Sequence, residues 1–181
     1  MEINGIHPYK KQGITYKRPE PSNASKKAIG EFAERIAKKL GFQSGQELES
    51  IVTELGGKIR YLDPDQLKAT ESGSILVHER GNFEIFLSNL TGILRNRFTT
   101  AHELGHYFLH SNQGADSIQV ERNGSDRLEW EANWFAASFL MPEENVKNKW
   151  NETKNVSFLA TYFQVSLAAM EVRLRSLELR N

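Results

Sequence analysis

The sequence predicts an α+β domain, in which several helices pack on a small sheet. Apolar residues recur at helical spacing in two stretches near the start of the chain and in two longer stretches in its second half. Between these pairs lie three short strand-like runs, separated by turn signals. Because helical and strand-like segments come in separate groups, their order favours an α+β architecture.

The first half of the chain contains an irregular segment, two helices and the strands. Residues 1–23 are rich in Pro, Gly and Lys and are expected to be extended or flexible. Amphipathic helices are expected over 24–40, which Gly41 stops, and over 45–55. The expected strands are 58–62, 74–79 and 83–88, with Arg80-Gly81-Asn82 as the hairpin turn between the last two.

One strand of this hairpin is expected to border a cleft. An exposed strand edge can bind an extended peptide as an additional strand. Ile75–His78 and Phe83–Ser88 are the two candidates for this role. Both strands could equally serve only to fill the core, and the sequence does not separate these alternatives.

The second half is predicted to be helical. Helices are expected over 93–110 and 126–141, with a polar loop at 111–125 between them and a short helix after Pro142. The C-terminal stretch suggests two helices joined by a turn at 164–166. The predicted organisation is an N-terminal segment (1–23), a central α+β domain (24–150) and a C-terminal helical pair (151–181), which resembles a helix-turn-helix.

Composition excludes several classes of protein. Lys and Arg balance Asp and Glu at a formal net charge of zero, which argues against direct nucleic-acid binding. The chain contains no Cys, so a metal site must use His and carboxylates. No apolar run is long enough for a secretory signal or a membrane span, so a cytoplasmic protein is expected.

The sequence His102-Glu103-Leu104-Gly105-His106 is an H-E-x-x-H motif within a helical pattern. Positions i and i+4 lie one above the other on a helix, so His102 and His106 can present two imidazoles to one Zn2+. Glu103 lies about 100° further round the helix, where a general base is needed. His110 continues the series, but it would lie about 12 Å from His102 along a regular helix, which is too far to share one ion.

A third ligand is expected from the helix at 126–141. This helix is apolar on most faces, so a carboxylate within it needs a partner. Glu129 and Glu131 point in directions about 200° apart and cannot serve the same role. Glu129 is favoured as the ligand because Asn133, at i+4 on its face, can support a ligand through a hydrogen bond. Glu131 is the alternative, and it otherwise reads as a solvated or ion-paired residue.

The segments RFTTAHELGHYFLH and DRLEWEANWFAASFLMP resemble those of the ImmA/IrrE family of bacterial and phage metallopeptidases, from Arg97 to Pro142. The resemblance implies a zincin-like fold, with His102, His106 and Glu129 as ligands of Zn2+ (or Mn2+) and Glu103 as the catalytic base. Tyr107 and His78 are weaker candidates for stabilising the transition state.

The resemblance also implies a function, namely limited proteolysis of a helix-turn-helix repressor that relieves repression of transcription, or membership in a toxin–antitoxin-like pair. One alternative is a non-proteolytic module that binds a repressor or antitoxin and keeps a structural metal. Another is a DNA-binding regulator that acts through residues 157–181, although few basic residues cluster there.

Overall fold

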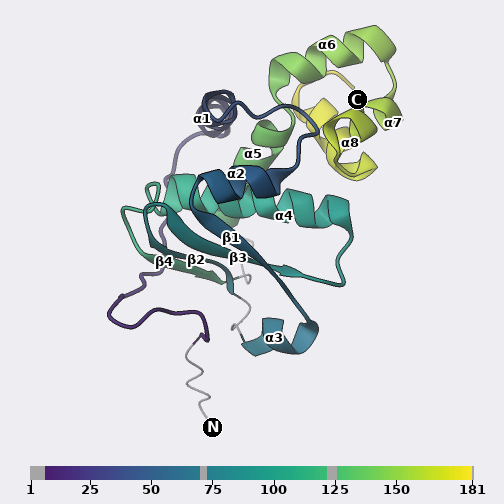
Figure 1. The fold of residues 1–181 in the computed structure, drawn as a ribbon. Coiled ribbons are helices and arrows are strands. Elements are labelled where there is room, and N and C mark those ends of the chain that lie inside the picture. The colour runs from purple at the N-terminus through teal and green to yellow at the C-terminus, as the bar shows by residue number, and fades with distance from the viewer. Residues whose placement is uncertain (1–6, 70–72, 122–125, 181) are drawn as a thin grey trace.

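The computed structural model describes residues 7–69, 73–121 and 126–180, and within them the chain folds as an α+β domain. A four-stranded sheet forms the lower layer in Figure 1, and helices α1, α2, α4 and α5 lie above it. Helices α1 (Lys26–Lys39) and α2 (Leu48–Glu54) precede the first strand in the chain, and α3 (Pro64–Ala69) connects the first strand to the second. Helix α4 (Ile93–Gly105) and the π-helical turn η1 (His106–His110) follow the third strand. The helices that follow the fourth strand are α5 (Arg127–Leu140), α6 (Glu143–Thr153), α7 (Val156–Phe163) and α8 (Leu167–Ser176).

The sheet has the order β1-β3-β2-β4. Its strands are β1 (Gly57–Leu62), β2 (Gly73–Glu79), β3 (Asn82–Ser88) and β4 (Ile118–Glu121). The hairpin expected around Arg80-Gly81-Asn82 is present, with β2 and β3 antiparallel and Gly81 at a positive φ of 71°. Strand β1 pairs with β3 in parallel, and β4 pairs with β2 in antiparallel orientation.

Of the two alternatives for Ile75–His78 and Phe83–Ser88, the free edge is wrong, and both segments contribute to the core. Both segments belong to inner strands that are paired on each side. The edge strands are β1 and β4, and β4 lies in a stretch that was expected to be a loop. Its outer edge is already bridged by Lys17, whose N–H donates to the Ser117 carbonyl (2.9 Å) and whose carbonyl accepts from the Gln119 N–H (3.2 Å).

The main core lies between the sheet and the helices. The helix-facing strand residues include Ile75, Val77, Ile85 and Leu87, all at most 1% exposed, and they pack in one cluster with the apolar side chains of α1, α4 and α5. Helix α1 begins where expected, because the Ser25 hydroxyl accepts a hydrogen bond from the Ala28 N–H. This layer fixes α4 and α5 against each other over the sheet.

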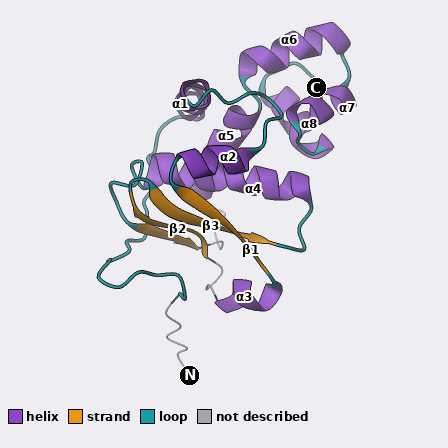
Figure 2. Ribbon diagram, in the orientation of Figure 1, coloured by secondary structure: helices purple, strands orange, loops and turns teal. Residues whose placement is uncertain are grey.

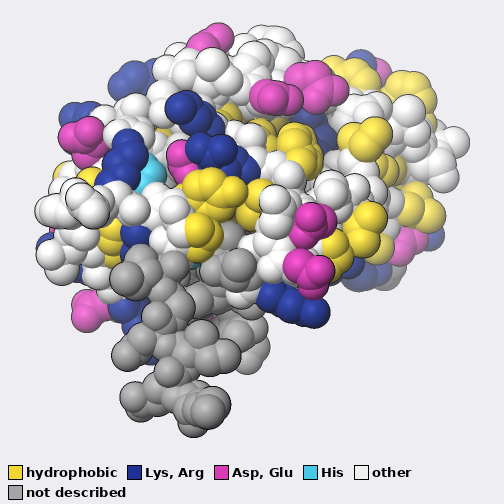
Figure 3. All heavy atoms as spheres, turned by 60° about the horizontal axis from the view of Figure 1, so that its bottom comes forward, with side chains coloured by type: hydrophobic (Ala, Val, Ile, Leu, Met, Phe, Trp, Pro, Cys, Tyr) yellow, Lys and Arg dark blue, Asp and Glu magenta, His cyan; other side chains and the backbone are white. Residues whose placement is uncertain are grey.

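The opposite face of the sheet is covered by the N-terminal segment and α3 (Figure 2). Leu62, Leu76 and Phe86 form a small buried cluster there, against which Tyr9 and Tyr16 pack. Seen from this side, acidic and basic side chains are interspersed with apolar ones (Figure 3). Residues 7–23 therefore run along the domain in the structure, although none of them belongs to a helix or a strand.

Helix α3 was not expected, although its start signal can be read in the sequence. The Asp63 carboxylate accepts a hydrogen bond from the Gln66 N–H (2.9 Å), and the Gln66 side chain accepts one from the Asp63 N–H (3.0 Å). Pro64 occupies the first helical position, where its missing N–H is tolerated. The Asp-Pro pair thus begins a helix as well as ending a strand.

The C-terminal helices α6, α7 and α8 form a cluster beyond α5 (Figure 1). The turn between α7 and α8 lies at Gln164, which adopts a left-handed conformation. Arg173 of α8 is buried at 7% exposure, donates to the Met141 carbonyl (3.0 Å) and pairs with Glu34 (3.4 Å). This arginine therefore joins the helical pair to the rest of the domain. No helix in the described part of the chain has the length and apolar character needed to cross a membrane.

Candidate metal centre

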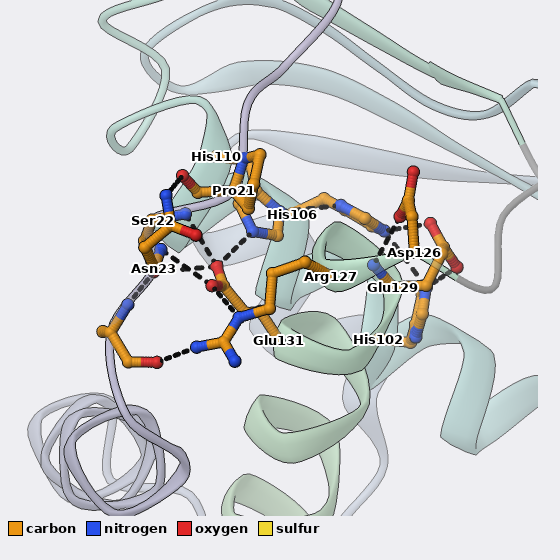
Figure 4. Close-up of polar contacts among 11 residues, drawn as sticks. Pro21, Ser22, Asn23, His102, His106, His110, Asp126, Arg127, Glu129 and Glu131 are labelled. Atoms are coloured by element: carbon orange, nitrogen blue, oxygen red, sulfur yellow. Dashed lines mark hydrogen bonds and ion pairs between the residues drawn. The ribbon is translucent and has the colours of Figure 1, made fainter.

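Three of the predicted side chains converge on one point between α4 and α5 (Figure 4). The Nε2 atoms of His102 and His106 are 3.1 Å apart. Oxygens of the Glu129 carboxylate lie 3.2 Å from His102 Nε2 and 3.4 Å from His106 Nε2. His106 is fully buried, whereas the His102 and Glu129 side chains keep 13% and 15% of their surface exposed. The group is therefore open on one side.

The close approach of the two helices depends on a glycine. Gly105 lies opposite Ala132 of α5, and a Cβ at position 105 would lie 3.1 Å from the Ala132 Cα and 3.2 Å from its carbonyl oxygen. Any larger residue would hold the helices apart. The glycine inside the H-E-x-x-H motif thus lets α5 bring Glu129 up to the two histidines.

Helix α5 presents Glu129 in its first turn. The Asp126 carboxylate caps this helix by accepting a hydrogen bond from the Glu129 N–H (3.3 Å), as the capping spacing predicts. Asn133, one turn later, lies 2.9 Å from His102 Nδ1 through its Oδ1 atom. A hydrogen bond from Nδ1–H to this oxygen leaves the Nε2 lone pair of His102 directed at the convergence point.

The other histidine is supported differently, because the helix changes its pitch after Gly105. Residues 106–110 form a π-helical turn, in which the Ser111 N–H donates to the His106 carbonyl (3.0 Å), five residues earlier. The continuous α-helix expected over 93–110 therefore ends at Gly105. In this turn the Nδ1 atoms of His106 and His110 lie 2.9 Å apart, and His110 points away from the convergence point, as its distance from His102 predicts.

The alternative ligand Glu131 lies behind His110 and outside the group. Its side chain is fully buried, and its Oε2 lies 3.1 Å from His110 Nε2. It is held by residues of the N-terminal segment and by Arg127 of its own helix (Figure 4). Glu131 was expected to be either solvated or ion-paired if it is not a ligand, and the structure shows it ion-paired. No pattern in the sequence predicts the contact between His110 and Glu131.

Electrostatics at the centre follow from burial and from these contacts. Burial alone would raise the pKa of Glu129, but the two adjacent histidines lower it to about 2. Burial lowers the pKa of His106 to about 3, although Glu129 opposes the change. Burial also acts to lower the pKa of His102, but Glu129, Glu103 and Asn133 outweigh it, and the net shift is upward. An ionised carboxylate beside neutral His106 is the donor set that a divalent cation needs.

Glu103 lies at the same opening, 2% exposed, in a pocket of about 320 Å3 that His102, Glu129 and Asn133 also line. The two weaker candidates are elsewhere. Tyr107 stacks on Phe83 with ring centroids 4.3 Å apart, and its hydroxyl accepts from the Gly81 N–H (3.3 Å).

His78 makes a 2.5 Å hydrogen bond with Tyr16, a residue of the N-terminal segment that covers the opposite face of the sheet. The structure therefore does not bring Tyr107 or His78 into the group as transition-state donors.

The donor set fits Zn2+. In a tetrahedral site with bonds of about 2.0–2.1 Å, neighbouring ligand atoms lie about 3.3 Å apart. The three separations here are 3.1, 3.2 and 3.4 Å. Two imidazoles and one carboxylate leave a fourth position toward the pocket, as in catalytic zinc sites.

Fold and site together define a metallopeptidase-like protein of the zincin type, with two histidines where α4 passes into η1 and a carboxylate from α5 converging on one point. A family model described as Peptidase M78, the IrrE N-terminal-like domain, matches residues 53–175. The chain belongs to this family of ImmA/IrrE metallopeptidases. Comparison with curated proteins gave no match.

Proposed function

We propose that the protein is a zinc-dependent endopeptidase that cleaves a partner protein, with a helix-turn-helix transcriptional repressor as its substrate. The observation that carries the catalytic part is the convergence of His102, His106 and Glu129 beside the buried carboxylate of Glu103. Membership of a peptidase family supports the same activity. The choice of a repressor rests on the ImmA/IrrE resemblance and on the groove described below.

The chemistry divides between the metal and the protein. A Zn2+ ion held by the three ligands would polarise the scissile carbonyl and lower the pKa of a water molecule toward about 7. Glu103 accepts the proton of the attacking water and passes it to the nitrogen of the leaving amine. Asn133 keeps the His102 ring oriented. The buried setting of Glu103 keeps bulk water from competing for its proton.

A groove next to the centre suits a helical substrate. It encloses about 820 Å3 between α1, α5 and α8, and it shares Phe98 and Asn133 with the active-site pocket. Its lining includes the small side chains Ala137 and Ala169 and the 58% exposed Val172, together with charged side chains, several of them from α1. The apolar side chains of such a groove can accommodate the apolar face of an amphipathic helix, and its charged side chains can contact the polar flanks. We assign it to a helix of the substrate protein, whose adjoining segment then reaches Glu103.

The test uses Glu103→Gln as a trap in lysate of the source cell. Retained proteins are identified and then incubated with the wild-type enzyme, with and without a chelator. One protein cut at a discrete position, only by the wild type and only with metal, supports the proposal. A partner that is retained but never cut favours the non-proteolytic binding module. Glu84→Gln serves as control, because Glu84 pairs with Arg60 away from the centre and its loss should leave cleavage intact.

The groove is tested by a matched pair of variants on one helix. Val172→Glu places a charge in the groove, whereas Leu167→Glu places one on the same helix outside it, at a residue of similar exposure (49%). We expect Val172→Glu to raise the KM for the protein substrate at unchanged zinc content, and Leu167→Glu to behave like the wild type. Equal effects of the two variants would show that the groove does not bind the substrate.

Direct DNA binding by the C-terminal helices has less support. Arg173 is buried and bonded within the domain, and Arg180 lies 4.0 Å from Glu171. Salt-dependent binding of duplex DNA by the isolated protein would favour that alternative.

A further inference from the structure

The metal ligand His106 is connected to the N-terminal segment through two fully buried side chains. His106 Nδ1 lies 2.9 Å from His110 Nδ1, and His110 Nε2 lies 3.1 Å from Glu131 Oε2. Both side chains of the His110–Glu131 pair have 0% exposure. Neither residue reaches the convergence point of the ligands. Their burial next to a ligand requires an explanation, because isolated polar groups are costly inside a protein.

The Glu131 carboxylate accepts hydrogen bonds from five donors. Its Oε2 accepts from the Ser22 N–H (2.8 Å), the Ser22 hydroxyl (2.7 Å) and His110 Nε2 (3.1 Å). Its Oε1 accepts from the Asn23 N–H (2.8 Å) and from Arg127 Nε (2.9 Å). The Arg127 guanidinium also donates to the Ala24 carbonyl, which fixes the N-terminal segment from a second side. This arrangement immobilises Glu131 more firmly than an ordinary surface ion pair would.

The five donors also define the direction of each hydrogen bond in the chain. An ionised carboxylate only accepts, so His110 Nε2 carries the proton. A neutral His110 then offers the lone pair of its Nδ1, which accepts from the Nδ1–H of His106. His106 is thereby held in the tautomer whose Nε2 lone pair faces His102 and Glu129. Each hydrogen bond between His106, His110 and Glu131 therefore joins one donor to one acceptor.

We infer that His110 and Glu131 are positioning residues for the metal ligand His106, and that Ser22 and Asn23 of the N-terminal segment complete this support. Because His106 is the ligand without access to solvent, its orientation depends on this line of contacts. His102, in contrast, is oriented by Asn133 within the two helices. The N-terminal segment, far from the H-E-x-x-H motif in sequence, is thus part of the metal centre. This inference rests on the proposed metal site.

The experiment measures metal binding rather than cleavage. Zn2+ affinity is determined by competition with a chromophoric chelator, and the absorption spectrum of the Co2+-loaded protein reports the geometry of the ligands. His110→Ala and Glu131→Gln are expected to weaken Zn2+ binding by about 10–100-fold and to alter the Co2+ spectrum. Ser22→Ala removes one donor of the five and should give an affinity between those of Glu131→Gln and the wild type.

Two controls separate positioning from general destabilisation. Glu84→Gln removes another mostly buried, arginine-paired carboxylate, 8% exposed, on the opposite face of the sheet. It should lower the unfolding temperature without changing Zn2+ affinity or the Co2+ spectrum. His110→Asn keeps an acceptor near the position of Nδ1 and should recover part of the affinity lost in His110→Ala. If Glu131→Gln does not fold, the His110 and Ser22 variants decide the question.

The outcomes are distinct. Folded variants of His110, Glu131 and Ser22 that bind Zn2+ within twofold of the wild type, with an unchanged Co2+ spectrum, would overturn the inference. A wild-type protein that binds neither Zn2+ nor Co2+ would instead refute the proposed metallopeptidase function.

Discussion

Substituting Gly105 by Ala tests whether the contact between α4 and α5 sets the metal centre. The added methyl group would lie 3.1 Å from the Ala132 Cα, 3.2 Å from the Ala132 carbonyl oxygen and 3.2 Å from the Phe135 Cβ. Non-bonded carbon atoms prefer separations of about 3.5–4.0 Å. None of the three neighbours is the end of a flexible side chain, so α5 itself must retreat by a few tenths of an ångström.

The expected loss of stability is small. Overpacking of this kind costs about 1–3 kcal/mol, and alanine recovers about 1 kcal/mol relative to glycine within a helix. The net change in the free energy of unfolding is therefore about 0–2 kcal/mol. Zn2+ affinity is expected to be sensitive to this movement of α5, because zinc ligands must keep their distances to within about 0.2 Å. We expect Zn2+ affinity to fall at least about tenfold, which corresponds to about 1.4 kcal/mol.

The assay pairs chelator competition for Zn2+ with urea unfolding of the metal-free protein. Gly30→Ala is the matched control, because its added methyl group would also meet α5, 3.0 Å from the Ser138 hydroxyl oxygen. That oxygen is the end of a side chain and can rotate away, so Zn2+ affinity should stay at the wild-type value. A Gly105→Ala protein with unchanged Zn2+ affinity would refute the reasoning that this glycine sets the approach of Glu129.

Three further predictions concern the ligands and the pH dependence of stability. Glu129→Gln should reduce the zinc content of the purified protein, measured by atomic absorption. Glu103→Gln should retain stoichiometric zinc and lose cleavage. Substantial activity of Glu103→Gln would show that Glu103 is not the base. Chelation should lower the unfolding temperature, because a metal present at 1,000 times its Kd stabilises the folded state by about 4 kcal/mol, and an unchanged temperature would contradict binding at this site. Burial, assisted by Lys11, lowers the pKa of His78 from 6.5, so the unfolded chain takes up a proton that the folded protein resists. Stability should therefore fall as the pH drops below about 6.5, and urea titrations of His78→Gln should show a smaller fall than the wild type; equal slopes would contradict this assignment.

The sequence predicts the convergence of His102, His106 and Glu129 because the position of each side chain depends on local geometry. The four-residue spacing of His102 and His106 places both on one helix face, and the cap at Asp126 positions the first turn that carries Glu129. Glu131 was separable from Glu129 by direction alone. These relations require only a regular helix over a few residues.

The features that the sequence does not predict depend on irregular or distant structure. The contact of His110 with His106 arises in a π-helical turn, whereas apolar spacing alone predicts a continuous α-helix. Strand β4 has only four residues and alternates too briefly to be distinguished from a loop. The hydrogen bonds of Ser22 to Glu131 join residues 109 positions apart, for which no local pattern exists.

The 109 positions between Ser22 and Glu131 also affect the order of events in folding. A ribosome adds about 5–20 residues per second, so Ser22 is incorporated roughly 5–20 s before Glu131. During this interval the N-terminal segment lacks the carboxylate that anchors it, and contacts between such distant residues form slowly. Completion of the proposed metal centre is therefore expected to be a late event in folding. The H-E-x-x-H helix can form before the N-terminal segment has made its contacts with Glu131.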